Sequence, residues 1–531
     1  KQSGQDLFPL SKILDDLPEL LSQGNGETII HIDQTFGIQS KPAFQEFTDK
    51  LSKKAHLLSA LCTCLYVNEP SGTQDCFTGH FLIRNNWQDS QEFIEIRVAV
   101  VGNVDSGKST MLGVLTKGIL DDGRGKARIQ LFKHKHEIET GRTSSIGQEI
   151  MCFDQGGNVI KCIESVGTSS TAHHKLSWEE LGMRATKVVN FIDLAGHEKY
   201  LKTTMFGLTG FAPDFAMLMV GANMGLVGMT KEHLSLVFAL NVPVFIVITK
   251  IDMCPPEVLA ENIRQIHKLL RSNSCRRVPV MIKQIENVVG LMKSMVIERM
   301  CPIFQVSNVS GEGLSLLSSF LNLLPSHMKF HPELPIEFEI NEHFSVPGAG
   351  TVIAGNLIKG TLALGQTVLL GPSSDGSFIT TSIKGIQRKR MEVESLVAGQ
   401  YGSIALKKVK RSILRKGMVL LGKDHPSLIS PDTPNRPVCT GRTCYEFDAE
   451  VLVLYHSTTM TLNYQSMLHC GVVRQTASIV GIGERTCLRT GDRAIVRFRF
   501  LKRPEFLREG SKLLFREGRT KGVGRIIKLH E

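Results

Sequence analysis

The alternation of hydrophobic and polar positions divides the chain into three regions. Between residues 96 and 325, short continuous apolar runs alternate with longer amphipathic stretches, which is the pattern of buried parallel strands separated by helices. This region predicts an α/β domain with a mostly parallel sheet, in which ligands bind at the carboxyl ends of the strands. The expected strands are Ile96–Val101, Val188–Asp193, Phe215–Val220, Val244–Thr249 and Ile303–Ser307.

The regions on either side have different patterns. In residues 1–95, the runs Thr28–Ile32, Ala60–Val67 and Gly79–Arg84 predict strands. The amphipathic stretch Ala43–Leu58 predicts a helix, so a small α+β domain is expected. From residue 333, short strands separated by Gly and Pro turns favour two β-barrels. The expected boundaries are 1–95 and 96–328 for the first two domains, 333–424 and 444–531 for barrel domains II and III, and 425–443 for the linker between the barrels.

Composition limits the classes of protein that fit. At 531 residues the chain is too long for one hydrophobic core, which agrees with several domains. No apolar run reaches the ~18 residues of a membrane-spanning helix, so no membrane partner is expected. The twelve cysteines include no C-x-x-C pair, which favours reduced thiols in the cytoplasm over a disulfide scaffold or a zinc site. Because the chain begins at Lys1, we expect its true N-terminus to lie upstream.

The net charge of +11 is unevenly distributed. Residues 1–332 sum to zero, and residues 333–531 carry the whole positive excess. This asymmetry suggests that the barrels contact a polyanion, although a basic face that only aids solubility would have the same composition. The basic residues form three clusters: Lys384, Arg388, Lys389 and Arg390; Lys407, Lys408, Lys410, Arg411, Arg415 and Lys416; and Arg497, Arg499, Lys502 and Arg503.

The strongest chemical signal follows the first strand of the α/β domain. The pattern G-x-x-x-x-G-K-S begins at Gly102, directly before a helical segment, in the strand–loop–helix order of a phosphate-binding P-loop. The glycines permit a tight turn that exposes backbone N–H groups. Lys108 supplies a charge for the phosphates, and the Ser109 hydroxyl is placed to ligate Mg²⁺. The predicted nucleotide-binding residues here are Gly102, Asn103, Val104, Asp105, Ser106, Gly107, Lys108, Ser109 and Thr110.

The second expected strand ends in a D-x-x-G pattern that is followed by histidine. Asp193 at the strand end is positioned to hold Mg²⁺ through water, and Gly196 lets a backbone N–H approach a γ-phosphate. His197 follows directly, where its side chain could orient an attacking water. The pattern is weak by itself, but its position at a strand end after a P-loop makes it a strong indication of nucleotide hydrolysis.

Two further strand ends have the features of a guanine site. The fourth strand ends at Thr249 and is followed by Lys250 and Asp252. Asp252 would accept hydrogen bonds from N1–H and the 2-amino group of guanine, a pair that adenine cannot form, and the Lys250 stem would lie along the base. The fifth strand ends in a polar turn suited to guanine O6, made of Ser307, Asn308 and Val309.

These motifs, in this order, resemble the guanine-nucleotide motifs of the translational GTPases. The histidine after Gly196 and the helix start Thr230-Lys-Glu-His233 both resemble that family. Residues Phe344–Gly355 are similar to the second domain of elongation factors Tu and 1-alpha. Two other stretches, Arg489–Asp492 and Phe515–Thr520, are similar to the third domain. The whole set is most similar to the GTP-binding protein 1 and 2 group, which implies a GTPase with GTP or GDP and Mg²⁺ as ligands and His197 as the catalytic residue.

The sequence departs from the family pattern in the nucleotide motifs. Asn103 and Ser106 stand where the family usually has histidines. Thr249 replaces an asparagine, which is expected to weaken the bracing between loops, while Asp252 is kept. These departures leave the phosphate and guanine contacts in place but alter how the loops are held together.

The switch motif, usually arginine-glycine-isoleucine-threonine, differs as well. Here Arg142 is followed by Thr-Ser-Ser-Ile, and aligning the arginines makes Ser145 the Mg²⁺ ligand, with Thr143 as the alternative. The charged stretch Gly118–Thr140 before it is expected to be a mobile loop that nucleotide orders. The metal ligands that the resemblance implies are therefore Ser109, Ser145 and Asp193.

The resemblance implies a switch protein of the elongation factor 1-alpha type, acting as a cytoplasmic monomer. The barrels would contact RNA, holding tRNA or a tRNA-shaped protein, and the complex would meet the ribosome in elongation, rescue or surveillance. Two alternatives stay open. One is a GTP-dependent scaffold for protein partners with little useful hydrolysis, motivated by Ser144, Ser145 and Thr249. The other is a GTPase subunit of a sulfate-activating complex, which the basic rear region disfavours.

Overall fold

A computed structural model describes residues 10–530 apart from 70–75, 87–92, 130, 133–134, 141–142, 162, 166–172, 274, 293–294, 296–298, 327–329, 429–440 and 519. The chain forms two compact units. The first comprises Lys1–Glu198, Asp214–Phe238 and Val242–His327, and the second comprises Lys199–Pro213, Ala239–Asn241 and Met328–Glu531. Within the described residues, no helix has both the length and the apolar character needed to cross a membrane.

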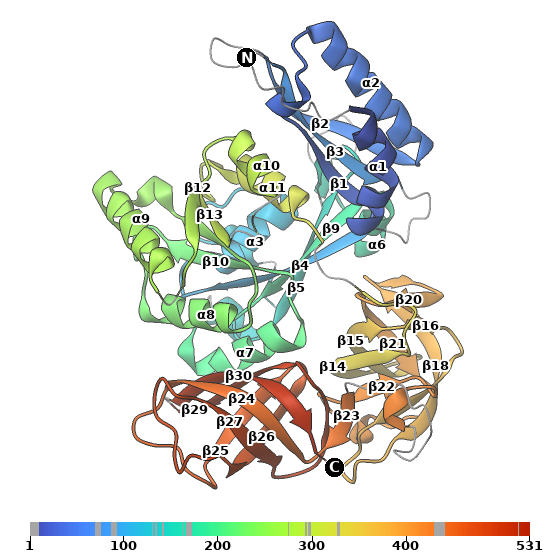
Figure 1. The fold of residues 1–531 in the computed structure, drawn as a ribbon, viewed down its shortest axis with the longest axis vertical. Helices are drawn as coiled ribbons and strands as arrows, with labels where there is room; N and C mark the ends of the chain where they lie inside the picture. The colour runs from blue at the N-terminus through green and yellow to red at the C-terminus, as the bar shows by residue number, and fades with distance from the viewer. Residues whose placement is uncertain are drawn as a thin grey trace, which may run out of the picture. The chain divides into compact units, whose positions relative to one another are not determined.

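The N-terminal part of the first unit is a three-stranded antiparallel sheet of order β1-β3-β2 with two helices, α1 and α2 (Figure 1). The predicted strands and helix are present, and Ser40 caps α2 by accepting a hydrogen bond from the Ala43 N–H. Helix α1 is not predicted by the sequence pattern, because it contains Pro18, a residue that weakens a helix signal. The elements are α1 (Leu10–Gln23), β1 (Glu27–Ile32), α2 (Lys41–Leu57), β2 (Ala60–Asn68) and β3 (Thr78–Asn85).

The rest of the first unit is built on an eight-stranded sheet of order β12-β13-β11-β10-β4-β9-β5-β6. The first six strands of this order, from β12 through β9, pair in parallel. Strand β5 pairs antiparallel with β9, and β6 pairs antiparallel with β5 at the edge of the sheet. The five predicted parallel strands are all present, which gives the α/β architecture that the apolar runs predict. The strands are β4 (Ile94–Gly102), β5 (Gly147–Phe153), β6 (Val159–Ile160), β9 (Lys187–Asp193), β10 (Phe215–Gly221), β11 (Val244–Thr249), β12 (Val278–Met281) and β13 (Met300–Gln305), with a separate hairpin of β7 (Ile163–Ser165) and β8 (His173–Lys175).

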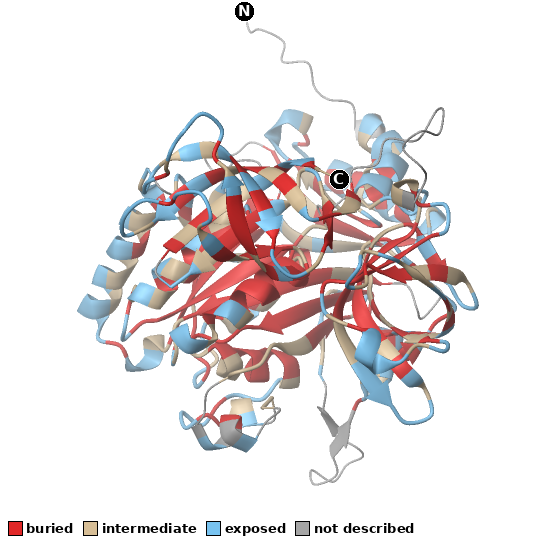
Figure 2. Ribbon diagram, turned by 90° about the horizontal axis from the view of Figure 1, so that it is seen from below, coloured by how far each residue is buried: buried red, intermediate tan, exposed pale blue. Residues whose placement is uncertain are grey.

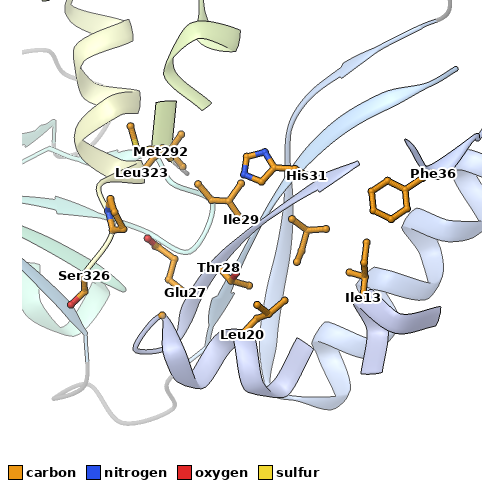
Figure 3. A pocket seen from close by; sticks show the side chains of 13 residues that line it. Ile13, Leu20, Glu27, Thr28, Ile29, His31, Phe36, Met292, Leu323 and Ser326 are labelled. Carbon is orange, nitrogen blue, oxygen red and sulfur yellow. The ribbon is translucent and has the colours of Figure 1, made fainter. Parts of the chain in front are cut away.

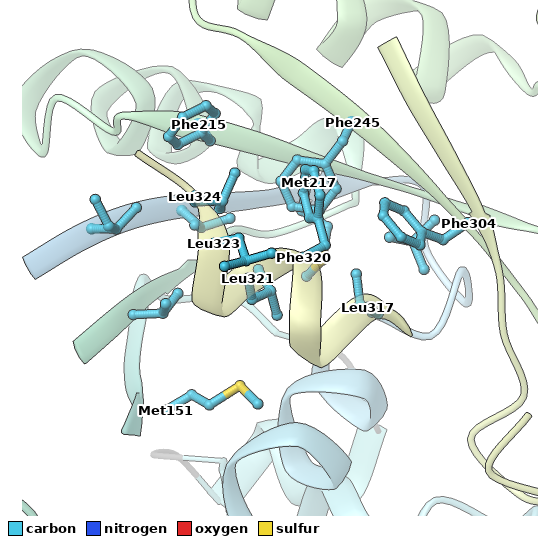
Figure 4. Packing of buried hydrophobic residues seen from close by; sticks show 14 of the residues in the cluster. Met151, Phe215, Met217, Phe245, Phe304, Leu317, Phe320, Leu321, Leu323 and Leu324 are labelled. Carbon is cyan, nitrogen blue, oxygen red and sulfur yellow. The ribbon is translucent and has the colours of Figure 1, made fainter. Parts of the chain in front are cut away.

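Helices connect these strands. Figure 2 shows many strands of the chain as buried (red) and many loops and outer helix turns as exposed (pale blue). Phe320 of the last helix packs edge-on against Phe245, with ring centroids 4.9 Å apart, and also against Phe304 (Figure 4). The helices are α3 (Lys108–Lys117), α4 (Lys126–Ile129), α5 (Lys135–Thr140), α6 (Trp178–Arg184), α7 (Leu201–Gly210), α8 (Gly228–Ala239), α9 (Pro256–Arg271), α10 (Ile285–Met292) and α11 (Leu314–Leu323). Of these, α7 belongs to the second compact unit.

A buried ion cluster joins the N-terminal sheet to the large sheet within the first unit. The Glu27 carboxylate accepts hydrogen bonds from Lys187 Nζ and Arg84 Nε, both at 2.6 Å. Lys187 also donates to the Leu324 carbonyl at 2.7 Å, and Arg84 donates to the Asn322 side chain at 2.9 Å. Because Lys187 begins β9 and Glu27 begins β1, the two sheets share one set of buried charges.

The second unit contains two β-barrels. In the first, strands follow the order β17-β22-β14-β15-β21-β18-β19, and the pairing of β17 with β18 closes the sheet. In the second, β24-β27-β26-β25-β29-β30 form a closed barrel. The strands are β14 (Glu337–Val346), β15 (Gly350–Lys359), β16 (Thr361–Ala363), β17 (Thr367–Gly371), β18 (Ile379–Arg388), β19 (Met391–Glu392), β20 (Ser395–Val397), β21 (Tyr401–Leu406), β22 (Val419–Leu421), β23 (Gly441–Cys444), β24 (Glu446–Tyr455), β25 (Gln465–Cys470), β26 (Val473–Gly481), β27 (Arg493–Phe500), β28 (Glu505–Arg508), β29 (Lys512–Glu517) and β30 (Thr520–Leu529). The predicted multidomain class, an α/β domain followed by two barrels, is confirmed, while most of the expected linker 425–443 lies outside the described residues.

Candidate functional site

Glycines and a buried histidine set the shape of the P-loop turn. Gly102, at the end of β4, has a φ of +147°, and a Cβ there would lie 2.4 Å from the Met219 carbonyl oxygen. Its N–H donates a 3.1 Å hydrogen bond to Nδ1 of His233, which is fully buried on α8. Gly107 has a φ of +82° and precedes Lys108, the first residue of α3. Larger residues at the two glycines would displace the loop.

Lys108 lies buried in the centre of this loop. Its Nζ donates to the carbonyl oxygens of Asn103 at 2.7 Å and Gly102 at 3.3 Å. Burial lowers the pKa of Lys108 to about 8, and the carboxylate of Asp193 opposes this shift. A Cβ on Gly196 would lie 2.4 Å from Nζ, so the D-x-x-G segment passes directly against the lysine and needs glycine there.

Three oxygen-bearing side chains meet beside the lysine. Ser109 Oγ donates to Asp193 Oδ2 at 2.9 Å, and Thr143 Oγ1 lies 2.8 Å from Ser109 Oγ and 3.4 Å from the same carboxylate oxygen. Burial raises the pKa of Asp193 to about 6, although Lys108 and both hydroxyls favour its ionised form. The buried Oδ1 atom of Asp193 has no hydrogen-bond partner among the described residues. Such a set of hard oxygen donors fits Mg²⁺.

The switch segment presents a different hydroxyl from the one that the motif alignment selects. Ser145 and Ser144 donate to Oε1 of Glu137 through their hydroxyls, at 3.1 and 2.8 Å, and through their backbone N–H groups, at 3.1 and 2.7 Å. Glu137 is only 1% exposed, so its carboxylate holds both serines. Thr143, the alternative ligand, lies beside Ser109, so the predicted role of Ser145 in holding Mg²⁺ stays a prediction that the hydrogen bonds to Glu137 disfavour, whereas Arg142 lies outside the described residues.

The guanine-side motifs lie at the ends of β11 and β13. Thr249 Oγ1 donates to the Ser106 carbonyl at 2.9 Å, so the hydroxyl links β11 to the P-loop, while the expected weakening relative to asparagine stays a prediction. A Cβ on Gly107 would lie 3.5 Å from Thr249 Oγ1 and 3.7 Å from Asn308 Nδ2. The P-loop and both guanine-side segments therefore converge around Gly107.

The individual guanine-side residues differ in exposure. Asp252 is exposed in a short 3₁₀ turn, and Lys250 precedes it with a φ of +61°. Ser307 is fully buried, and its Oγ accepts hydrogen bonds from the N–H groups of Val309 and Ser310, at 3.2 and 3.1 Å. Ser307 thus shapes the turn, while the exposed Asp252 carboxylate remains accessible to a base.

A cavity of about 40 Å³ lies over the P-loop. It brings His197 together with the phosphate-side residues, and it also includes Arg128, which the sequence analysis did not select. The motifs gave no signal for Arg128 or Glu137, since both lie in the charged stretch before the switch motif. The lining residues are Val104, Asp105, Gly107, Lys108, Ser109, Thr110, Arg128, Thr143, Gly196 and His197.

A larger pocket of about 400 Å³ lies elsewhere in the first unit, where α1 and β1 face the ends of α10 and α11 (Figure 3). Its lining is mainly apolar, with Ile13, Leu20, Ile29, Phe36, Met292 and Leu323 among the contributors. The Glu27 carboxylate in its wall is already bonded to Lys187 and Arg84. The P-loop cavity, where Lys108, Ser109 and His197 meet, is therefore the candidate site.

The site combines a P-loop with Asp193, Gly196 and the T-K-x-D segment, and two barrels follow it in the chain. These features define a P-loop nucleotide hydrolase with the architecture of a translation factor. Residues 95–326 match the elongation factor Tu GTP binding domain, and residues 350–421 match elongation factor Tu domain 2. The chain is 47% identical over 523 residues to GTP-binding protein 1 of Xenopus laevis, covering 97% of this chain and 76% of the relative. The chain belongs to the elongation factor Tu family of GTPases, in the group of GTP-binding proteins 1 and 2.

Other relatives agree with this placement. GTP-binding protein 2 of Homo sapiens is 45% identical over 444 residues, covering 82% of this chain and 70% of the relative. The motifs had pointed to GTP-binding protein 2, and the similar identities place the chain with the group as a whole. The GTP-bound GTPase-like domain of S. cerevisiae Ski7 has the same fold, with a TM-score of 0.59 and 12% identity over 82% of this chain and 98% of that one. Bacterial selenocysteine-specific elongation factor EF-Sec gives a TM-score of 0.57 at 19% identity, covering 82% of this chain and 58% of that one.

Proposed function

We propose that this GTPase works as a switch in the cytoplasm, acting with tRNA or a tRNA-shaped protein at the ribosome. The observation that carries the proposal is the convergence of Ser109, Thr143 and Asp193 beside Lys108, with His197 in the same cavity. A switch-segment hydroxyl at this position links the nucleotide state to the conformation of the segment. The family domains matched by the chain come from a translation factor, which supports the ribosomal partner.

The roles we assign follow the geometry. Lys108 and the P-loop N–H groups bind the β- and γ-phosphates, and Ser109, Thr143 and Asp193 hold Mg²⁺, Asp193 through water. Bound Mg²⁺ would neutralise phosphate charge in the transition state. Asp252 binds the guanine edge and Ser307 shapes the turn beside it. Gly196 brings its backbone to the γ-phosphate because no side chain separates it from the lysine.

Changing His197 to alanine tests the catalytic assignment. We expect ribosome-stimulated GTP hydrolysis to fall on the order of 100-fold or more, because the side chain that orients the attacking water is lost. Nucleotide affinity should stay within about twofold, since His197 does not bind the base or the β-phosphate. Single-turnover hydrolysis with ribosomes gives the rate, and His56→Ala on the exposed face of α2 is the control. Unchanged stimulated hydrolysis in His197→Ala would contradict the assignment.

The structure reduces the number of basic residues available to RNA. In the first cluster Arg388 and Lys389 are buried, at 4% and 8% exposure. In the third, Arg497 pairs with Asp448 at 2.8 Å. Arg499 and Arg503 also pair with carboxylates. The loop after β21 differs, because its four exposed cations form no ion pair with a described residue: Lys407, Lys408, Lys410 and Arg411.

This exposed loop supplies the test of the RNA contact. Changing Lys407, Lys408 and Lys410 to alanine should weaken co-sedimentation with ribosomes in the presence of a non-hydrolysable GTP analogue about tenfold, and flatten its salt dependence. The charge-matched control changes three exposed lysines of the first unit to alanine: Lys41, Lys50 and Lys53. An equal loss in both variants, or no loss in the loop variant, would refute a specific contact by this loop.

The alternative of a GTP-dependent scaffold is motivated by departures from the family's switch and guanine motifs at Ser144, Ser145 and Thr249. Thr143 provides the switch hydroxyl and Thr249 braces the P-loop, so both motifs keep the groups that hydrolysis needs. We therefore favour the hydrolysing switch. Ribosome co-sedimentation that is the same with GDP and with the GTP analogue would count against the switch.

A further inference from the structure

Residues 118–129, which follow α3 and include α4, are called the cap here. The side chain of Asp121 holds the backbone of the cap together. The buried Asp121 carboxylate accepts hydrogen bonds from the N–H groups of Gly123 and Gly125, both at 3.1 Å, and of Ala127 at 2.9 Å. The N–H of Asp121 donates to the Asn308 carbonyl at 2.9 Å. Asp121 therefore links the start of this segment to the guanine-side turn.

The cap also packs tightly on the helix that follows the P-loop. A Cβ on Gly113 of α3 would lie 2.1 Å from the Ala127 carbonyl oxygen, so only glycine permits this approach. Asp122 adds a second set of bonds by accepting from the N–H groups of Arg124 at 2.9 Å and Lys126 at 3.3 Å. The short helix α4 is thus held at a defined distance from the phosphate-binding helix.

This arrangement places Arg128 of α4 in the wall of the phosphate cavity. Arg128 lines the cavity with Lys108, Thr143, Gly196 and His197, whereas Arg124 of the same cap is exposed and does not line it. A guanidinium remains charged at any physiological pH and offers donors in a planar fork that matches phosphate oxygens. The cavity therefore contains a second cation besides the P-loop lysine.

We propose that Arg128 is a catalytic residue that contacts the γ-phosphate and stabilises the transition state of GTP hydrolysis from within the same chain. The water oxygen attacks the γ-phosphorus, the bond from that phosphorus to the β–γ bridging oxygen breaks with its electron pair staying on the GDP oxygen, and the protons of the water leave with inorganic phosphate as dihydrogen phosphate. Arg128 transfers no proton and neutralises charge on the phosphate oxygens while that bond breaks. This inference rests on the proposed roles of the P-loop residues.

Single-turnover hydrolysis without ribosomes tests the inference in the full chain. Arg128→Ala is expected to lower the rate on the order of 100-fold or more, while GDP affinity stays within about twofold because GDP has no γ-phosphate. Arg128→Lys, which keeps the charge but not the fork, should recover part of the rate. Arg124→Ala removes the same charge from the exposed side of the cap and should hydrolyse GTP like the wild type.

A transition-state analogue separates this role from a structural one. The wild-type protein with GDP and aluminium fluoride should form a tight complex, and Arg128→Ala should lose it while still binding GDP. Wild-type hydrolysis or unchanged fluoride binding in Arg128→Ala would overturn the inference. A wild-type protein that bound no GTP would instead refute the proposed function itself, so the two failures are distinguishable.

Discussion

Asp252→Asn should lower the affinity for GTP on the order of 100-fold or more, because two charge-assisted hydrogen bonds to guanine are lost or inverted. The same variant should bind xanthosine triphosphate more tightly than the wild type, since the asparagine amide donates to the C2 carbonyl of xanthine. The exposed position of Asp252 makes the change compatible with folding. Titration calorimetry with GTP and with xanthosine triphosphate measures both affinities in the wild type and in the variant.

A matched control for this prediction lies five residues further along the chain. Glu257 is exposed in the first turn of α9, so Glu257→Gln removes one negative charge near the site without altering a base contact. Its GTP affinity should equal that of the wild type. Retention of wild-type GTP affinity by Asp252→Asn would show that another residue recognises the base.

Glu27→Gln is expected to destabilise the first unit by about 3–5 kcal/mol at neutral pH, because it leaves Lys187 and Arg84 buried with no carboxylate partner. Calorimetric unfolding measures the loss. The control is Glu46→Gln on α2, where the Glu46–Lys50 pair is exposed, and it should change stability by less than about 1 kcal/mol. Equal stability of the two variants would contradict the structural role of the cluster.

The same cluster predicts a pH dependence. Burial opposes ionisation of Glu27, but Lys187 and Arg84 outweigh this effect and hold its pKa below the usual 4.5. A carboxylate whose pKa is lower in the folded than in the unfolded state stabilises fully above the unfolded value, and this contribution disappears as the pH falls through the folded pKa. The stability difference between the wild type and Glu27→Gln should therefore shrink in acid, and its plateau above about pH 5 should end at alkaline pH, where Lys187, whose pKa burial lowers to about 8, loses its charge.

The parallel sheet and the P-loop site could be predicted because each motif ends a strongly apolar strand. Once β4, β9, β11 and β13 are assigned, parallel pairing brings their carboxyl ends to one edge of the sheet, and the motif residues with them. Lys108, Gly196 and Thr249 therefore meet although they are distant in sequence. Periodicity and turn residues were enough for this part of the fold.

Other features depend on contacts that no local pattern encodes. Motif alignment selects Ser145, but its hydroxyl is bonded to Glu137, a buried carboxylate on α5 that no motif predicts. Charge counting likewise places Arg497 in a basic cluster, whereas the structure pairs it with its cross-strand neighbour Asp448. Pairings across strands and between loops decide such cases, and they become visible only in three dimensions.

The Glu27 cluster connects the N-terminal elements to the strand that carries Asp193. Strand β9 is anchored at its first residue by Lys187 and reaches the nucleotide site at its last, Asp193. Cutting the polypeptide at residue 93 would remove Glu27 and Arg84 and leave the Leu324 carbonyl as the one remaining hydrogen-bond partner of Lys187 among the described residues. The N-terminal elements are thus part of the same structural unit as the nucleotide site, and a variant without them is a poor substitute for this chain in activity measurements.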